Sequence, residues 1–224
     1  MVIPGELVER FATGNGSLFV DAGLSVGAGL PSWTELLAPL EKELDAVLGP
    51  VGYTGIAPYY EVAFSRRALI DKLRSQLRRQ KLEPTDVHRA LLALPPRRIF
   101  TTNFDNLIES AAHTAGVVCD RVLRNEHLSL IDESRLQVVK VHGDLDALET
   151  VVLTTDDYRD FISSRGGIAD LLKVELQIKT VLFLGYSFND QDLGVVLAQV
   201  SREGAVLPIP DTFGAPTCLA RGAT

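Results

Sequence analysis

Cysteine is scarce in this sequence: Cys119 and Cys218 are the two cysteines among 224 residues. Two thiols cannot supply the four ligands of an all-cysteine zinc site, so a zinc module of that kind is excluded. The composition also differs from that of small disulfide-dependent folds and favours a reducing, cytoplasmic compartment. Because His113 and His127 have no companions at metal-ligand spacing, we expect no metal site.

Long hydrophobic runs and an excess of positive charge are also missing. No stretch approaches the about 18 apolar residues that a membrane span requires, so no membrane association is expected. The net charge of −7 argues against general adhesion to nucleic acid. A local exception is Arg66–Lys81, where leucines at every fourth position predict an amphipathic helix with a basic face. Such a face is most often solvated, and contact with a partner protein or guide nucleic acid is the alternative.

Two phosphate-binding fingerprints, G-x-G-x-x-G and G-x-x-x-x-G-K-[ST], are absent as well. What the chain does contain is an alternation of short apolar runs and helical segments. This pattern predicts an α/β fold with a doubly wound, mostly parallel, Rossmann-like sheet. The expected strands are 17–22, 98–101, 117–120, 136–141, 150–153 and 180–184. The expected helices are one starting at Ser32, then 65–81, 85–94, 103–115, 155–164, 167–178 and 190–201.

The domain organisation follows from where strands are missing. Residues 36–94 contain helices but no convincing strand, so we interpret them as a helical insertion after the first strand. We expect 1–224 to form a single domain. The tail at about 202–224 offers at most one short strand near 217–220, and we expect it to be a truncated end of that domain or one part of a larger assembly.

Four polar or glycine-rich clusters follow expected strands, and ligands of a doubly wound sheet bind beyond the carboxyl ends of its strands. They are 21–33, 101–105, 142–144 and 185–190. Each cluster alone has an ordinary explanation, such as a flexible glycine turn, a helix N-cap at Asn103, or a strand-end histidine bonded to a backbone carbonyl. Four such clusters in order favour a shared ligand site.

This combination resembles the sirtuin-like domains of prokaryotes, over about residues 14–200. It is most similar to the phage-defence branch, which includes Thoeris effectors and proteins linked to short prokaryotic Argonautes. The matching motifs are G-A-G-x-S…G-[IL]-P (Ala22, Gly23, Ser25, Gly29, Leu30, Pro31), T-x-N-x-D (Thr101, Asn103, Asp105), His-Gly (His142, Gly143), G-x-S (Gly185, Ser187) and L-T-x-x-D-Y (Leu153, Thr154, Asp157, Tyr158).

The resemblance implies that NAD lies across the carboxyl edge of the sheet as substrate, without a metal. Asn103 and Asp105 would face its nicotinamide end, and His142 would bond the ribose hydroxyls and act as general base. The residues implied in binding the dinucleotide are Ala22, Gly23, Ser25, Pro31, Trp33, Thr102, Gly185 and Ser187.

The sequence departs from the family in ways that bear on its substrate. Asp21 replaces the first glycine of G-A-G, which places a carboxylate near the expected pyrophosphate. Protein-deacylating relatives carry two C-x-x-C pairs of a zinc ribbon and a V-x-F-G-E segment that clamps the peptide. This chain has neither, and residues 151–156 stand where the clamp would be.

The resemblance and its departures together favour an NAD-consuming hydrolase that releases nicotinamide and ADP-ribose. We expect a toxic effector of bacterial antiphage defence, triggered by homo-oligomer assembly or by a partner protein of the defence system. The alternatives are a catalytically silent NAD- or ADP-ribose-binding sensor and, less favoured, an NAD-dependent protein deacylase.

Overall fold

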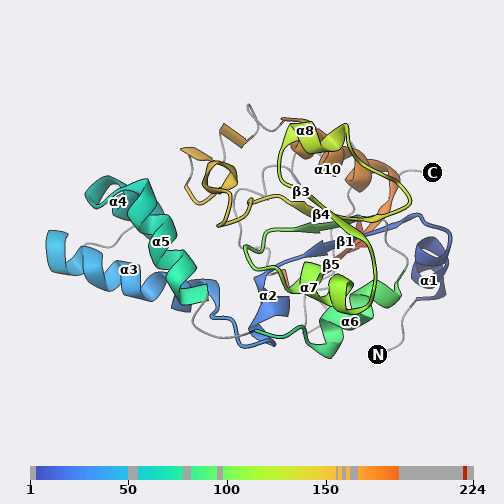
Figure 1. Ribbon diagram of the computed structural model, residues 1–224, viewed down its shortest axis with the longest axis horizontal. Coiled ribbons are helices and arrows are strands. Elements are labelled where there is room, and N and C mark those ends of the chain that lie inside the picture. The colour runs from blue at the N-terminus through green and yellow to red at the C-terminus, as the bar shows by residue number, and fades with distance from the viewer. Residues whose placement is uncertain are drawn as a thin grey trace.

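The centre of the fold is a mostly parallel sheet with strand order β3-β4-β2-β1-β5-β6 (Figure 1). The computed structural model describes residues 4–49, 55–77, 82–94, 98–154, 156–157, 160–161, 166–186 and 219–220. The strands are β1 (Gly16–Val20), β2 (Arg98–Thr101), β3 (Cys119–Val122), β4 (Leu136–Lys140), β5 (Thr180–Leu184) and β6 (Leu219–Ala220). β1 to β5 pair in parallel, and β6 pairs antiparallel to β5. The expected doubly wound sheet is therefore confirmed.

One face of the sheet is covered by α10 (Gly166–Ile178). Phe19 points to this face and stacks on Phe183 with ring centroids 5.1 Å apart. Leu172 and Leu176 of α10 belong to the same buried cluster. Because side chains alternate along a strand, Phe19 faces α10 while its neighbours in β1 face the other way.

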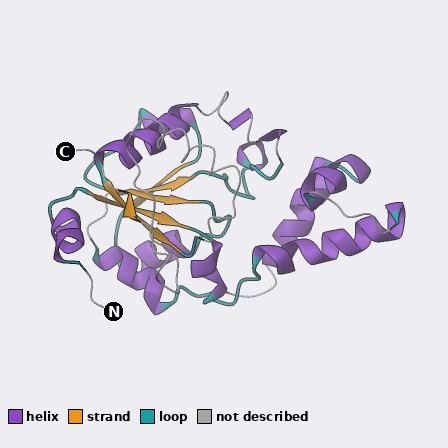
Figure 2. Cartoon of the chain, turned by 180° about the vertical axis from the view of Figure 1, so that it is seen from behind, coloured by secondary structure: helices purple, strands orange, loops and turns teal. Residues whose placement is uncertain are grey.

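The opposite face is covered by α1 (Gly5–Ala12), α6 (Asp86–Ala93) and α7 (Leu107–Thr114), as seen from behind in Figure 2. Leu18 and Val20 of β1 pack here with Leu91 of α6 and Ile108 of α7. Helices on both faces explain why β1 is buried along its whole length. His88 lies inside α6, where its Nδ1 accepts the Thr85 amide hydrogen, so it caps the helix as an ordinary packing histidine.

Three helices project to one side of the sheet (Figure 1): α3 (Trp33–Leu48), α4 (Ile56–Ala63) and α5 (Arg66–Leu77). The N-terminus of α3 has a capping box between Ser32 and Glu35, so this helix starts where it was expected. Leu40 and Leu69 lie at the centre of the buried cluster that these helices share. Leu145, Val151 and Leu153 from the segment after β4 complete that cluster.

The positive charges of α5 are largely used within the protein. Arg66 pairs with Asp157 at 2.9 Å and Lys72 pairs with Glu43. Arg74 pairs with Asp71 at 3.3 Å. These pairs reduce the positive charge that the described part of the basic face offers to nucleic acid, and residues 78–81 of that face lie outside the described residues.

Three expectations about local structure are wrong. The glycine-rich stretch after β1 begins with a short helix, α2 (Ala22–Val26), rather than a flexible loop. The helix expected at 103–115 begins at Leu107, which leaves Asn103 in the loop before it. Residues 151–153 are not a strand: they follow the 3-10 helix η1 (Leu148–Thr150), and the Val152 amide donates to the His142 carbonyl oxygen outside the sheet.

The end of the chain agrees with expectation where it is described. β6 lies within the short strand predicted near 217–220. The expected helix 190–201 and most of 202–224 lie outside the described residues. Among the described helices, none is long and apolar enough to cross a membrane.

A further short helix, α8 (Asn125–Leu128), follows β3.

The packing of the projecting helices predicts a large effect of truncating Leu40, which is fully buried. Leu40→Ala should lower the free energy of unfolding by about 2–5 kcal/mol, because it removes apolar contact and leaves a cavity. Urea denaturation measures this. The control is Val62→Ala in α4, where the side chain is 89% exposed; it should change the free energy by less than about 0.5 kcal/mol. Equal effects of the two variants would contradict a packed α3–α5 core.

Candidate functional site

The candidate site lies where three neighbouring strands end together. Val20 of β1 is in register with Thr101 of β2, and Thr101 is in register with Lys140 of β4. The segments that follow, starting at Asp21, Thr102 and Val141, therefore leave the sheet at adjacent points of its carboxyl edge. This is the edge at which doubly wound sheets bind ligands.

Ser25, Asn103 and Asp105 form one chain of hydrogen bonds at this edge. The Asn103 Nδ2 donates to Ser25 Oγ at 2.9 Å, and Ser25 Oγ donates to Asp105 Oδ2 at 2.8 Å. Ser25 is buried on α2, so the contact joins the segment after β1 to the segment after β2. The structure thus brings together three residues that are separated by up to 80 positions in the sequence.

Asn103 holds an acceptor without a partner among the described residues. Its backbone amide donates to Thr101 Oγ1 at 3.0 Å and its Nδ2 is bound to Ser25, while its buried Oδ1 makes no hydrogen bond there. The side chain is only 7% exposed. Because buried polar atoms are normally hydrogen-bonded, this oxygen is suited to accept from a bound ligand or water.

Asp105 both caps a helix and belongs to the site. Its Oδ1 accepts the Leu107 amide at 3.0 Å at the start of α7, and its Oδ2 accepts from Ser25. Asn103 is therefore not the N-cap of α7, which is Asn106, and the Asp105 carboxylate accepts the first helical amide. Each carboxylate oxygen keeps a second lone pair for a ligand.

Asp21, the residue that departs from the family pattern, is bonded across the site. The Thr102 hydroxyl donates to Asp21 Oδ1. The Asp21 amide in turn donates to the Leu184 carbonyl of β5 at 3.0 Å. Asp21 therefore ties the end of β1 to the segments after β2 and β5, and its carboxylate is held on Thr102.

Gly23 and Gly185 provide a close approach between two backbone segments. The Gly23 amide donates to the Gly185 carbonyl at 3.1 Å, and a Cβ on Gly23 would lie 2.6 Å from that oxygen. Gly185 has a φ of +69°, in the left-handed region that favours glycine. The Gly23 amide is thus committed to the protein, and the missing side chain of Gly23 allows the Gly185 backbone to approach.

His142 follows β4 in a tight turn. It is only 9% exposed, and its ring lies beside Phe104 with centroids 6.5 Å apart. The next residue, Gly143, has a φ of +80°, and a Cβ there would collide with the Thr150 carbonyl oxygen at 1.9 Å. Glycine is therefore needed at position 143 for this turn, which brings His142 next to the loop that carries Asn103.

Lys140 is a residue of the site region that the sequence did not single out. It is fully buried and its Nζ donates to the Asp105 carbonyl at 2.6 Å and to Asp144 Oδ2 at 3.2 Å. Burial opposes ionisation of Asp144, but the nearby Lys140 holds its pKa below the usual value. Burial raises the pKa of Glu109, which lies 3.5 Å from Lys140. One feature of the sequence could have indicated this role: a lysine ends an apolar strand. A charge buried at such a position requires a partner of opposite charge or an oxygen ligand.

The remaining expected residues are placed as follows. Trp33 is the first residue of α3 and is 44% exposed, and Ala22 begins α2. Pro31 lies between these two helices and is half-buried. Ser187 lies outside the described residues. In the described part of the chain no group of three or more His, Cys, Asp or Glu could hold a metal ion.

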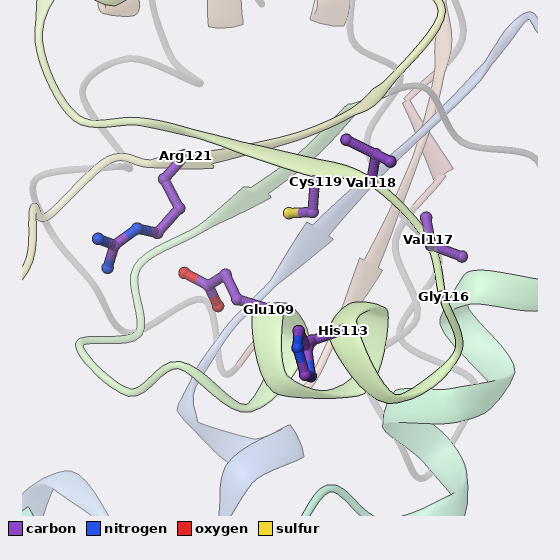
Figure 3. Close-up of a pocket in the computed structure, with 7 residues that line it drawn as sticks. All are labelled: Glu109, His113, Gly116, Val117, Val118, Cys119 and Arg121. Carbon is purple, nitrogen blue, oxygen red and sulfur yellow. The ribbon is translucent and has the colours of Figure 1, made fainter.

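A hollow of about 420 Å³ lies between α7 and β3, beside rather than within this site. In Figure 3 the side chains of Glu109 and Arg121 extend to the same side of this hollow, and Cys119 also lines it. Burial raises the pKa of the Cys119 thiol to about 11, so it stays protonated and is a weak nucleophile.

The fold and site define a doubly wound α/β protein with a polar ligand site at the carboxyl edge of its sheet. A family model described as "SIR2-like domain" matches residues 97–212, and the chain belongs to this family. It is 34% identical over 197 residues to "NAD(+) hydrolase ThsA" of Acinetobacter baumannii, covering 87% of this chain and 41% of that protein. It is 31% identical over 189 residues to the protein of the same name from Bacillus cereus, covering 83% and 40%.

A third relative is "Defense-associated sirtuin 2" of Bacillus subtilis, 28% identical over 206 residues, with coverage of 88% of this chain and 20% of that protein. The chain spans about two fifths of the length of the two hydrolases that it matches. The sequence-based recognition of a sirtuin-like domain is confirmed.

The contact between Gly23 and Gly185 predicts a specific steric effect. Gly23→Ala should lower the free energy of unfolding by about 1–3 kcal/mol, because the new methyl group meets backbone atoms. The matched control is Gly27→Ala on the same segment, where the added Cβ would lie an ordinary 3.5 Å from the Leu24 carbonyl oxygen. Thermal denaturation compares the variants. If Gly23→Ala is as stable as Gly27→Ala, the two segments are not in the described contact.

Proposed function

We propose that this chain hydrolyses NAD at the nicotinamide–ribose bond, giving nicotinamide and ADP-ribose. The observation that carries the proposal is the buried Asn103 Oδ1, which makes no hydrogen bond within the described residues and lies on the loop next to His142. The names of the relatives from A. baumannii and B. cereus, NAD(+) hydrolases, support the same reaction.

The chemistry requires one water molecule and one proton acceptor. As the bond to nicotinamide breaks, its electron pair leaves with the ring nitrogen and neutralises the pyridinium, and positive charge develops on the ribose. Water then attacks the ribose carbon and loses a proton. Asn103 Oδ1 is suited to orient the water or a ribose hydroxyl, and His142 to accept the proton. Asp105 would accept from the carboxamide with its remaining lone pairs.

The dinucleotide would lie across the segments after β1 and β5. The Gly23 amide is already given to Gly185, and the missing Cβ of each glycine lets the two backbone segments meet, so we assign Gly23 and Gly185 the role of holding these segments together beside the pyrophosphate. Ala22 and Ser25 would contact the phosphates from α2. Trp33, Pro31, Thr102 and Ser187 complete the proposed binding set.

We further propose that the chain is the NAD-cleaving part of an antiphage effector that acts in the cytoplasm. The name of the B. subtilis relative, a defence-associated sirtuin, supports this setting. Activation by homo-oligomer assembly or by a partner protein would keep such an effector silent in an uninfected cell.

A specific observation disfavours protein deacylation. The residues that stand in place of a peptide clamp are folded into the protein: Val151 and Leu153 are buried against α3–α5. The Leu153 amide donates to Asp157 Oδ2 at 2.8 Å. This segment therefore offers no free strand edge to an acylated peptide.

A silent sensor remains the second candidate, and a different observation favours it. Asp21 places a carboxylate at the start of the proposed pyrophosphate site, and both oxygens of Asp105 already accept from protein donors. Such a protein would bind NAD or ADP-ribose without turning it over.

Asn103→Ala and His142→Ala should each lower nicotinamide release from NAD by at least about 100-fold, because they remove the orienting acceptor and the general base. Chromatography of free nicotinamide and ADP-ribose measures the rate. The matched control is Asn106→Ala, three residues further along the same loop, whose exposed side chain makes no capping bond to α7. It should keep the wild-type rate.

Each alternative has its own outcome in the same assay. Release that occurs only with an acylated peptide would establish deacylation and overturn the proposal. NAD binding by calorimetry with no turnover, alone and after assembly, would establish the sensor. Loss of activity in Asn106→Ala equal to that in Asn103→Ala would show that the loop, rather than the Asn103 amide, is what matters.

A further inference from the structure

Lys140 is a cation in the dry interior of the protein. It is the last residue of β4, on the face where Leu136 and Val138 of the same strand pack in the apolar core. Its side chain has no exposed surface. A buried ammonium group is unfavourable unless oxygen atoms surround it, so its partners define what it does.

The partners of Lys140 come from the two segments that carry the proposed catalytic residues, the loop with Asn103 and the turn with His142. We call these the catalytic segments. Its Nζ donates to the carbonyl oxygens of Asp105 at 2.6 Å and Phe104 at 3.4 Å, on the loop that carries Asn103. It also donates to Asp144 Oδ2 at 3.2 Å, two residues beyond His142. One nitrogen atom therefore bonds to the two segments that hold the proposed catalytic groups.

The Lys140 nitrogen links the segments after β2 and β4 just beyond the last backbone hydrogen bond between these two strands. At the end of the β2–β4 pair the Val141 amide donates to the Thr101 carbonyl at 2.8 Å. After that point the chain turns out of the sheet on both sides. The Lys140 ammonium joins the two departing segments where the strand ladder between β2 and β4 has ended.

The charges around Lys140 form a small group that reaches the hollow in Figure 3. Glu109 Oε1 lies 3.5 Å from Lys140 Nζ, and Arg121 Nη1 lies 3.2 Å from Asp144 Oδ2. Two carboxylates thus alternate with two cations, in the order Glu109, Lys140, Asp144 and Arg121. Glu109 and Arg121, the outer members, both line that hollow.

We propose that Lys140 is a positioning residue for the hydrolysis proposed above: it sets the placement of Asn103 relative to His142 and acts on the chemical step more than on NAD binding. This inference rests on the proposed function. Small misplacements of reacting groups are costly, because a shift of about 1 Å can lower a rate by about 100-fold.

A purely structural role is the competing explanation, and the protein contains a matched buried pair that tests it. Arg98 begins β2 and pairs with Glu175 of α10; its side chain is 7% exposed and that of Glu175 is 3% exposed. Arg98 lies at the amino edge of the sheet, whereas Lys140 lies at the carboxyl edge. Loss of either cation leaves a buried carboxylate, but only Lys140 contacts the catalytic segments.

The experiment compares Lys140→Met with Arg98→Met in the chain, at a temperature where both variants remain folded. Both should unfold at lower urea concentration than the wild type. Lys140→Met should lower kcat for nicotinamide release by more than about tenfold while KM changes by less than about threefold, because the lost interaction concerns positioning rather than binding. Arg98→Met should keep kcat within about threefold. Equal losses of kcat in the two variants, or an unchanged kcat in Lys140→Met, would overturn the proposal.

Asp144→Asn is the second variant, for the case in which Lys140→Met does not fold. It keeps the shape of the side chain and weakens the link from Lys140 to the His142 segment. We expect kcat to fall by more than about threefold with KM unchanged, and an unchanged kcat would count against the proposal.

Failure of the proposed function is distinguishable from failure of this inference. If the wild-type chain releases no nicotinamide, either alone or after assembly, the hydrolase proposal fails, and amide hydrogen exchange still tests the positioning. Exchange at 103–107 and 142–146 should then accelerate in Lys140→Met but not in Arg98→Met. Equal protection in the two variants would show that Lys140 does not hold these segments together.

Discussion

The in-register ending of β1, β2 and β4 is the constraint on which the rest of the structure depends. Parallel pairing places Val20, Thr101 and Lys140 side by side, so the chain leaves the sheet at three adjacent points. A shift of one residue in either pair would turn every side chain of the shifted strand to the other face. Burial on both faces prevents that shift, because α10 covers one side and α1, α6 and α7 cover the other.

Polar side chains at this edge are hydrogen-bonded to one another. Ser25 links Asn103 to Asp105, and Thr102 holds the carboxylate of Asp21. Because buried donors and acceptors are costly when unpaired, a network of this kind has few alternative arrangements. Its exception is Asn103 Oδ1, the acceptor left without a partner among the described residues. The cost of unpaired buried polar atoms, which orders the site, thus also indicates where a ligand would bind.

Much of the fold and part of the site could be predicted from the sequence. Short apolar runs predicted most of the strands, and the start of α3 was predicted at Ser32. The run at 151–153 misled because burial alone does not distinguish a strand from an irregular segment packed between two clusters. Lys140 and its partners could not be foreseen, since they depend on which buried charges meet across β2, β4 and α7. The bond between Asp21 and Thr102 likewise appears only once two strand ends are adjacent.

We propose above all that NAD lies across this carboxyl edge with its nicotinamide ribose at Asn103 and His142. The most direct test is a crystal structure of the chain with an uncleavable NAD analogue, in which carbon replaces the ring oxygen of the nicotinamide ribose. The account predicts a ribose hydroxyl or an ordered water within hydrogen-bond distance of Asn103 Oδ1, with the pyrophosphate beside Gly23 and Gly185. An analogue bound in the hollow between α7 and β3, with the Asn103 site untouched, would contradict it.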